Sequence, residues 1–409
     1  MKRKILMIMP FENIYPPRNG GMHRCFHVFH QLSKYFDVTA VTHTRKEDLL
    51  SGTASYPAIA RASVYSTYDE IAPKDIFSFL PARTGNALKY RFIIKDLNRN
   101  TDSSFLKMYP ILNKLLSRQQ FDYIILENLQ LTYYASWIRK YNSKAAIFFN
   151  AYNVESLLAQ RNVNKTATQQ KEADDILRVE KNLYKIVDGI FCCSQVDLDI
   201  FTEMNREKIP LGYVLPNGID TTLLTHSINI SPEQLNNILF CGSLDYEPNK
   251  TGLLWFYKTV WPLVMQQLPG KVLCVVGRGN RQDYHDMLND PTVNFIGEVE
   301  DVEPWYRKCN IAIAPLLNGS GTRFKILEAM SLGNPVVTTS IGIEGIESVN
   351  EIHALIADDA IEFANKIIQL TNHPGKSSLI SSNARQLVET KYSWDIIGES
   401  LANYLAIAH

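Results

Sequence analysis

The chain lacks several features that mark whole classes of protein. Its 409 residues carry 42 Lys and Arg against 42 Asp and Glu, and a nucleic-acid binder needs a basic excess. Its six cysteines include no Cys-x-x-Cys pair, which argues against a disulfide framework and a zinc site. No uncharged apolar run approaches the roughly 20 residues of a membrane-spanning helix. It has no low-complexity tract and no repeat of the solenoid kind. What remains is an ordinary globular protein whose cysteines are small core residues.

The zero net charge conceals a division. Residues 1–220 carry 29 basic and 22 acidic side chains, whereas residues 221–409 carry 13 and 20. Segment 221–236, near the change of sign, is polar and has no strand pattern, so we interpret it as a linker. At about 150 residues per domain, the length itself favours two or three domains.

Short apolar runs alternate with longer helical patterns along both halves. The runs are 4–10, 38–42, 123–127, 146–150, 189–194, 213–217, 237–243, 271–277, 293–297, 311–317, 335–340 and 353–358. Runs without polar alternation are typical of parallel strands covered by helices on both faces. The helical patterns include 22–35, 167–186, 251–268 and 393–407. The pattern predicts an α/β protein with two doubly wound domains. The run at 4–10 resembles a signal peptide but is too short and has no cleavage site after it, so we interpret it as a strand.

Open α/β sheets bind ligands at the carboxyl ends of their strands. After the first strand, Gly20 and Gly21 open a helix whose free N–H groups suit an anion, although such a pair is more often only a turn. The segment LPNGID at 215–220 is by default a turn as well. In segment 241–250, Lys250 stands where a cation could reach a diphosphate, a solvated surface lysine being the alternative.

The strongest candidate site follows run 311–317. A turn at residues 318–322 leads into a helix whose first turns present Arg323 and Lys325, with Glu328 about one turn later. A helix N-terminus with two cations favours an anion, and a carboxylate accepts two hydrogen bonds from a sugar diol. The alternative for Glu328 is a surface charge paired with one of the cations. The small residue after Glu328 and the turn into the next strand favour an interior, functional position.

The segments PNGID and KILEAMSLGNPVV, with their spacing, resemble the retaining glycosyltransferases of family 4, in a sugar-transferase branch with G-S-G-T-R-x-K-I-L-E. The similarity covers nearly the whole chain and is strongest in 210–345. It implies the GT-B fold, in which two Rossmann-like doubly wound domains face each other across a cleft. It also implies an acceptor-binding domain at 1–220, a donor-binding domain at 221–392, and a C-terminal helix at 393–409 that crosses back to the first domain.

The resemblance further implies roles for single residues. Glu328 matches the second glutamate of an E-x7-E motif that holds the ribose hydroxyls, and Lys325 and Arg323 match positions near the diphosphate. The expected catalytic residues are Glu328, Lys325 and Ser320. The expected donor-binding residues are Gly20, Gly21, Gly242, Ser243, Lys250, Val299, Gly319, Gly321, Thr322 and Arg323. The expected acceptor-side residues are Tyr152, Asn153 and Glu155. We expect no metal site and no cofactor, with the nucleotide-diphosphate sugar as co-substrate.

Three positions depart from the family pattern. The first glutamate of E-x7-E falls on Ser320, the usual arginine after the first strand of the second half falls on Ser243, and Tyr152 stands where many relatives have histidine. The sequence predicts a metal-independent hexosyltransferase that moves sugar from a UDP or GDP donor to a glycan or lipid-linked acceptor, in cell-envelope polysaccharide or lipopolysaccharide synthesis. Two alternatives stay open: a non-catalytic subunit of the same fold that partners an active transferase, and a nucleotide-sugar epimerase. A dehydrogenase is disfavoured because no G-x-G-x-x-G follows the first strand.

Residues 83–118 carry eight basic side chains and only two acidic ones, with apolar residues between them. A solvated helix pair explains this pattern as well as a function does. The functional interpretation is a surface that contacts anionic membrane lipid, at about 1 kcal/mol per nearby cation. We therefore expect a cytoplasmic protein that is peripheral on the inner face of the plasma membrane, and no nucleic-acid partner.

Overall fold

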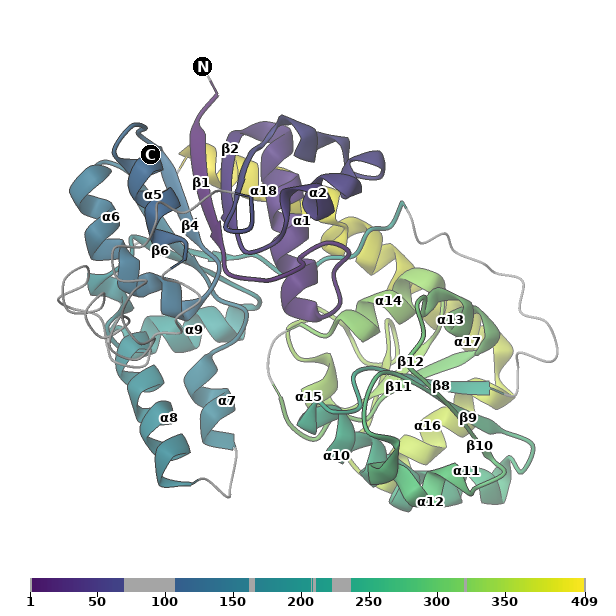
Figure 1. The fold of residues 1–409 in the computed structure, drawn as a ribbon. Helices are drawn as coiled ribbons and strands as arrows, with labels where there is room; N and C mark the ends of the chain where they lie inside the picture. The colour runs from purple at the N-terminus through teal and green to yellow at the C-terminus, as the bar shows by residue number, and fades with distance from the viewer. Residues whose placement is uncertain are drawn as a thin grey trace. The chain divides into compact units, whose positions relative to one another are not determined.

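The computed structural model describes residues 2–69, 107–161, 166–206, 208, 211–222, 237–319 and 322–407 (Figure 1). Within these ranges the strands form two separate sheets of seven and six strands. Every strand pairing in them is parallel. The chain divides into two compact units, of which the first comprises Met1–Ser156, Asn164–Leu215 and Gly398–His409 and the second Leu157–Val163 and Pro216–Ile397.

The first unit contains the seven-stranded sheet, in the order β3-β2-β1-β4-β5-β6-β7. Its strands are β1 (Lys4–Met9), β2 (Asp37–Thr42), β3 (Ser63–Ser66), β4 (Tyr123–Leu126), β5 (Ala146–Asn150), β6 (Gly189–Cys192) and β7 (Leu211–Val214). Its helices are α1 (Gly20–Tyr35), α2 (Lys46–Ser51), α5 (Tyr109–Leu116), α6 (Ala135–Tyr141), α8 (Ala167–Glu180) and α9 (Gln195–Met204). Two further helices, α7 (Glu155–Arg161) and α18 (Trp394–Ile407), have residues in both units.

The second unit contains the six-stranded sheet, in the order β10-β9-β8-β11-β12-β13. Its strands are β8 (Asn237–Cys241), β9 (Val272–Val276), β10 (Val293–Gly297), β11 (Ile311–Ala314), β12 (Val336–Thr338) and β13 (Leu355–Ile356). Its helices are α10 (Glu247–Trp255), α11 (Trp261–Gln267), α12 (His285–Leu288), α13 (Glu303–Lys308), α14 (Phe324–Leu332), α15 (Ser340–Ile343), α16 (Ala360–Asn372) and α17 (Pro374–Leu387). Helices cover both faces of this sheet in Figure 1.

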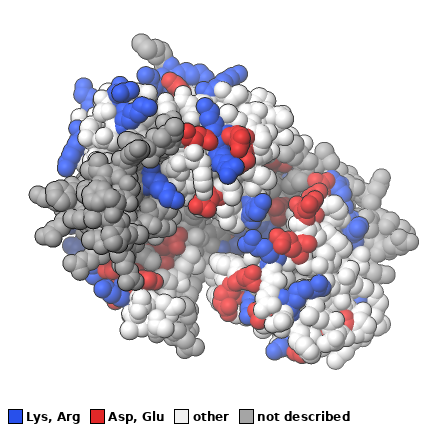
Figure 2. Space-filling model, in the orientation of Figure 1, with Lys and Arg blue, Asp and Glu red and all other residues white. Residues whose placement is uncertain are grey.

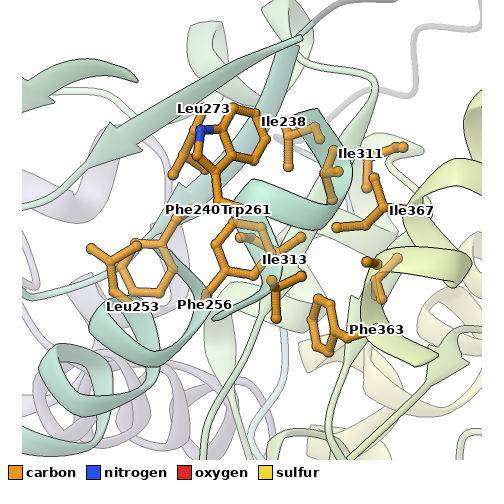
Figure 3. Close-up of a cluster of buried hydrophobic side chains, with 14 of the residues drawn as sticks. Ile238, Phe240, Leu253, Phe256, Trp261, Leu273, Ile311, Ile313, Phe363 and Ile367 are labelled. Carbon is orange, nitrogen blue, oxygen red and sulfur yellow. The ribbon is translucent and has the colours of Figure 1, made fainter. Parts of the chain in front are cut away.

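The second sheet is buried on both faces, which explains why its strands are continuous apolar runs. In β8, Ile238 and Phe240 enter one hydrophobic cluster, whereas Leu239 and Cys241 enter the other. The first cluster packs against α10, α11 and α16 and appears in Figure 3 around Phe240 and Trp261. Successive strand residues point to opposite faces, so a strand covered on both sides needs an apolar residue at every position.

The structure has a strand in each of the twelve predicted runs, and it adds β3, whose sequence SVYS is too short and polar to signal a strand. The predicted helix at 251–268 is interrupted by a π-helical turn at Phe256–Val260, immediately before α11. Pro262 in the first turn of α11 has no N–H and so removes one helical hydrogen bond there. All six cysteines are free and buried, as predicted.

Several expectations fall partly outside the described residues, namely most of the linker at 221–236 and most of the basic segment 83–118. In the parts of the chain that are described, no helix is both long and apolar enough for a membrane span. On the face drawn in Figure 2, positive and negative side chains of the described residues both occur. Close ion pairs occur among the described residues, including Arg307 with Glu303 at 2.5 Å.

Candidate functional site

The predicted donor residues of the second unit gather at the carboxyl edge of its sheet. Gly242 and Ser243 follow β8, Gly319 follows β11, and Lys325 and Glu328 lie on α14. The glycines after β8 and β11 have positive φ angles of 157° and 114°, which L side chains rarely adopt. Two expected residues of the same turn, Ser320 and Gly321, lie outside the described residues.

Lys325 is held by a neutral partner. Its Nζ donates to Asn249 Oδ1, and Asn249 Nδ2 in turn donates to the Ser243 carbonyl at 2.7 Å. The same Nζ lies 4.9 Å from the centre of the Phe240 ring, a favourable place for a cation. Burial lowers the pKa of Lys325 to about 8, and the nearby charge of Arg323 acts in the same direction. The lysine is therefore still mostly a cation at neutral pH, and the Asn249 contact does not neutralise it.

Glu328 is a half-buried carboxylate that receives a hydrogen bond from Tyr306. The Tyr306 hydroxyl lies 3.3 Å from Glu328 Oε2 and 3.1 Å from the Lys325 carbonyl, so one proton serves two acceptors. Burial raises the pKa of Glu328, whereas the Tyr306 hydrogen bond and the charge of Lys325 oppose the rise. This partner replaces the Lys325–Glu328 surface ion pair that the sequence allowed as an alternative. The carboxylate keeps lone pairs for a ligand.

Asn217 connects two motifs that are far apart in the sequence. Its side-chain N–H donates to the Thr322 carbonyl at 3.2 Å, which ties the PNGID turn to the turn before α14. Arg323 stands at the N-cap of α14, and its guanidinium lies against Gly319, where a Cβ would approach it to 2.8 Å. The PNGID segment therefore does more than turn the chain, since it supports the loop that carries the predicted anion site.

Two other predicted donor residues have partners of their own. The ammonium of Lys250 forms an ion pair with Asp283 at 2.7 Å, a bond that raises the pKa of the lysine. Val299, which follows β10, packs its side chain against the hydrophobic cluster beneath α14. A contact from Val299 to a nucleotide base would then come from its backbone, as expected, and the diphosphate role of Lys250 stays a prediction.

The strand ends of the second sheet approach so closely that only glycine fits at Gly277. Its φ is 155°, and a Cβ there would lie 1.8 Å from the Gly242 carbonyl oxygen. Gly277→Ala should therefore lower the free energy of unfolding by about 3 kcal/mol or more. Gly270→Ala is the matched control, because a Cβ at Gly270 meets nothing within 4 Å. Equal melting temperatures for the two variants would contradict this account.

In the first unit, the structure brings the predicted glycines and Tyr152 together. Gly20 and Gly21 open α1, and the Asn19 side chain caps this helix by accepting from the Met22 N–H at 2.9 Å. A Cβ on Gly21 would lie 3.4 Å from the Tyr152 ring.

Glu155 lies at the start of α7, beyond Tyr152. The buried carboxylate of Glu180 accepts from the Glu155 N–H at 2.8 Å and from the Ser156 N–H at 3.2 Å. Burial raises the pKa of Glu155, and a hydrogen bond from Asn153 opposes the rise. The three predicted acceptor residues therefore lie between the end of β5 and the first residue of α7, and Glu180 fixes that point to the rest of the unit.

Sequence reasoning did not identify three buried polar residues beside Tyr152. They are Arg24 on α1, Glu127 directly after β4, and Asn150 at the end of β5, and none is more than 1% exposed. The sequence did contain a signal for two of them, because the apolar runs YIILE and AIFFN end in a charged residue, Glu127, and an amide residue, Asn150.

Comparison with known proteins relates this geometry to a family. Residues 236–373 match the model described as Glycosyl transferases group 1. An uncharacterized 44.6 kDa protein in the cps region of Klebsiella pneumoniae is 24% identical over 95% of this chain and 96% of its own length. The capsular polysaccharide biosynthesis glycosyltransferase CapM of Staphylococcus aureus is 31% identical, over 30% of this chain and 32% of its own length.

Solved structures extend the similarity to the whole fold. The crystal structure of Anabaena Alr3699/HepE in complex with UDP matches with a TM-score of 0.69 at 14% identity, over 98% of this chain and 99% of that one. The fold is GT-B, as predicted. Residues 236–373 are therefore similar to the group 1 glycosyltransferases, and the relatives support sugar transfer as the class of reaction.

Proposed function

We propose that the chain is a retaining, metal-independent glycosyltransferase that moves a sugar from a UDP or GDP donor to a glycan or lipid-linked acceptor in cell-envelope polysaccharide synthesis. The observation that carries the proposal is the pairing on α14, where Lys325 and Glu328 reach the same edge of the sheet with neutral partners, Asn249 and Tyr306. A cation and a carboxylate with free capacity suit the diphosphate and the ribose diol of one nucleotide.

Each group then has a separate task. The bond from the anomeric carbon to the diphosphate breaks through an oxocarbenium-like state, and negative charge grows on the leaving oxygen. Lys325, Arg323 and the N–H groups that open α14 stabilise that charge. Glu328 accepts hydrogen bonds from the ribose hydroxyls and fixes the nucleotide. We assign no nucleophile, since retention in this fold is usually described as attack on the same face as the leaving phosphate.

The similar proteins support the biological setting. CapM acts in capsular polysaccharide biosynthesis by its name, and the Klebsiella relative lies in a cps region. The anionic membrane surface expected at 83–118 belongs to the proposal only as a prediction from sequence, because residues 83–106 lie outside the described ranges.

The test combines binding with turnover. A thermal-shift panel of UDP, GDP and ADP sugars should show one nucleotide class raising the melting temperature by mass action. Transfer from that donor should then continue in excess EDTA, because protein cations stabilise the diphosphate. A strict requirement for a divalent metal would contradict the metal-independent mechanism.

The panel and an assay for free sugar separate the two alternatives. A non-catalytic subunit, which Ser243 and Ser320 motivate, predicts no shift with any donor. An epimerase predicts release of free sugar from donor alone, at the same rate with and without an acceptor.

A further inference from the structure

A polar cluster of four residues lies at the carboxyl edge of the first sheet, where β4 and β5 are neighbours. The Tyr152 hydroxyl donates to Glu127 Oε2 at 2.7 Å, and Asn150 Nδ2 donates to the same oxygen at 2.9 Å. Asn150 Oδ1 accepts from Arg24 Nε at 3.1 Å and from Nη2 at 2.7 Å. Arg24 Nη1 donates to the Leu215 carbonyl at 2.7 Å.

These bonds fix the orientation of every polar atom but one. Because the Asn150 oxygen faces a guanidinium, its amide N–H can only point at Glu127. Glu127 Oε1 is buried and has no hydrogen-bond partner in the described part of the chain. A buried carboxylate oxygen without a partner is costly, so the cluster is not arranged for stability alone.

The surroundings of Glu127 make its ionised and protonated forms similar in free energy near neutral pH. Burial raises its pKa to about 7, although the Tyr152 bond, the charge of Arg24 and the Asn150 bond all lower it. Two other titratable groups adjoin Glu127, namely Tyr152 and Cys25 on α1, and burial raises the pKa of both, so that both stay neutral. The side chain of Tyr152 is half-buried and stacks on Phe11, with ring centres 5.9 Å apart. Of the pair Glu127 and Tyr152, Glu127 is fully buried and Tyr152 alone has exposed surface.

We infer that Glu127 is a positioning residue that sets the direction of the Tyr152 hydroxyl, and through it the hydrogen bond that Tyr152 offers to the acceptor. The inference rests on the proposed function, which places Tyr152 on the acceptor side. With Glu127 ionised, the phenol donates to the carboxylate, and its oxygen accepts from an acceptor hydroxyl. With Glu127 protonated on its free Oε1, Oε2 becomes a neutral and weaker acceptor, so it no longer fixes the phenol proton. The phenol can then turn its proton toward the acceptor hydroxyl.

The first test needs no substrate. Infrared spectra of the wild type minus those of Glu127→Gln should contain a protonated-carboxyl band that disappears as the pH rises through about 7. The subtraction removes the band of Glu180, whose pKa burial also raises to about 7. Tyr152→Phe removes a hydrogen bond to the ionised form, so it should raise the midpoint of this titration by at least about one pH unit. The control is Glu172→Gln, an exposed residue of the same unit, which should leave the band unchanged. An unchanged midpoint in Tyr152→Phe would overturn the coupling.

The second test measures turnover. UDP-glucose and GDP-mannose serve as donors, with water and octyl glucoside as the acceptor probes. The wild-type rate should fall about fivefold from pH 8 to pH 6 on the acidic limb, since the ionised fraction of Glu127 falls about tenfold while half of Lys325 has already lost its proton at pH 8. Glu127→Gln and Tyr152→Phe should abolish this limb without changing the donor KM, provided that both variants melt as the wild type does.

The outcomes separate the two claims. Wild-type turnover with an acidic limb that survives in Glu127→Gln would overturn the positioning role and leave the proposed function intact. A wild-type protein that neither binds nor turns over any nucleotide sugar would overturn the proposed function, whatever the infrared titration shows.

Discussion

Replacing Glu328 by alanine is expected to raise the donor KM at least a hundredfold. Each hydrogen bond from a sugar hydroxyl to a charged carboxylate contributes about 1.5–3 kcal/mol, and 1.4 kcal/mol corresponds to a factor of ten. A ribose diol makes two such bonds. The donor KM is measured by steady-state kinetics with the donor that the thermal-shift panel identifies. The rise in melting temperature that this donor causes in the wild type should be absent in Glu328→Ala at moderate donor concentration.

Two further variants sharpen this result. Glu362→Ala removes an exposed glutamate of the same unit and should leave the donor KM unchanged. Tyr306→Phe removes only the hydroxyl that supports Glu328 and should raise the donor KM a few-fold. A wild-type donor KM in Glu328→Ala would remove Glu328 from the site.

Replacing Lys325 by methionine is expected to lower kcat about a hundredfold to a thousandfold, with a smaller effect on the donor KM. Methionine keeps an apolar stem against Phe240 but removes the charge, so the fold is preserved. The cation matters most when the diphosphate leaves, and loss of one preorganised electrostatic group has a cost of this size. A variant with wild-type kcat and a high donor KM would instead show that Lys325 only binds the ground state.

The lowered pKa of Lys325 also predicts how the activity depends on pH. With this pKa lowered to about 8, the ammonium is protonated below pH 8 and loses its charge as the pH rises through that value. Wild-type activity should therefore fall on the alkaline side near pH 8, and Lys325→Met should lose this limb. Lys258→Met, which removes an exposed lysine, should keep both the rate and the limb. With Glu127 on the acidic side, the complete profile should be a narrow bell.

The sequence predicted most of the second site because its chemistry is local. Arg323, Lys325 and Glu328 lie within two turns of one helix, so their spacing already places them at one strand end. What it did not reveal was the set of partners. Asn249 is 76 positions from Lys325, Tyr306 is 22 from Glu328, and Asp283 is 33 from Lys250. These partners decide which charges stay available to a ligand.

In the first unit, less of the site was predicted from the sequence than in the second. The residues Tyr152, Asn153 and Glu155 were predicted through the family pattern, whereas Glu127, Asn150 and Arg24 were not. In the sequence, Glu127 and Asn150 are simply polar residues at the ends of two strands. Arg24 is 126 positions from Asn150. No periodicity relates residues so far apart.

The amino-acid sequence by itself determined that the chain forms parallel strands covered by helices, because a strand buried on both faces needs an apolar residue at each position. It also predicted an anion site on α14, because a glycine-rich turn and its cations are contiguous. Only the tertiary structure decided that Glu127 faces Tyr152 and Arg24. That contact depends on β4 pairing with both β1 and β5. The sheet order places β4 beside β1, although β2 and β3 separate them along the chain. Strand order is set by how helices pack across the sheet, and local sequence does not contain it.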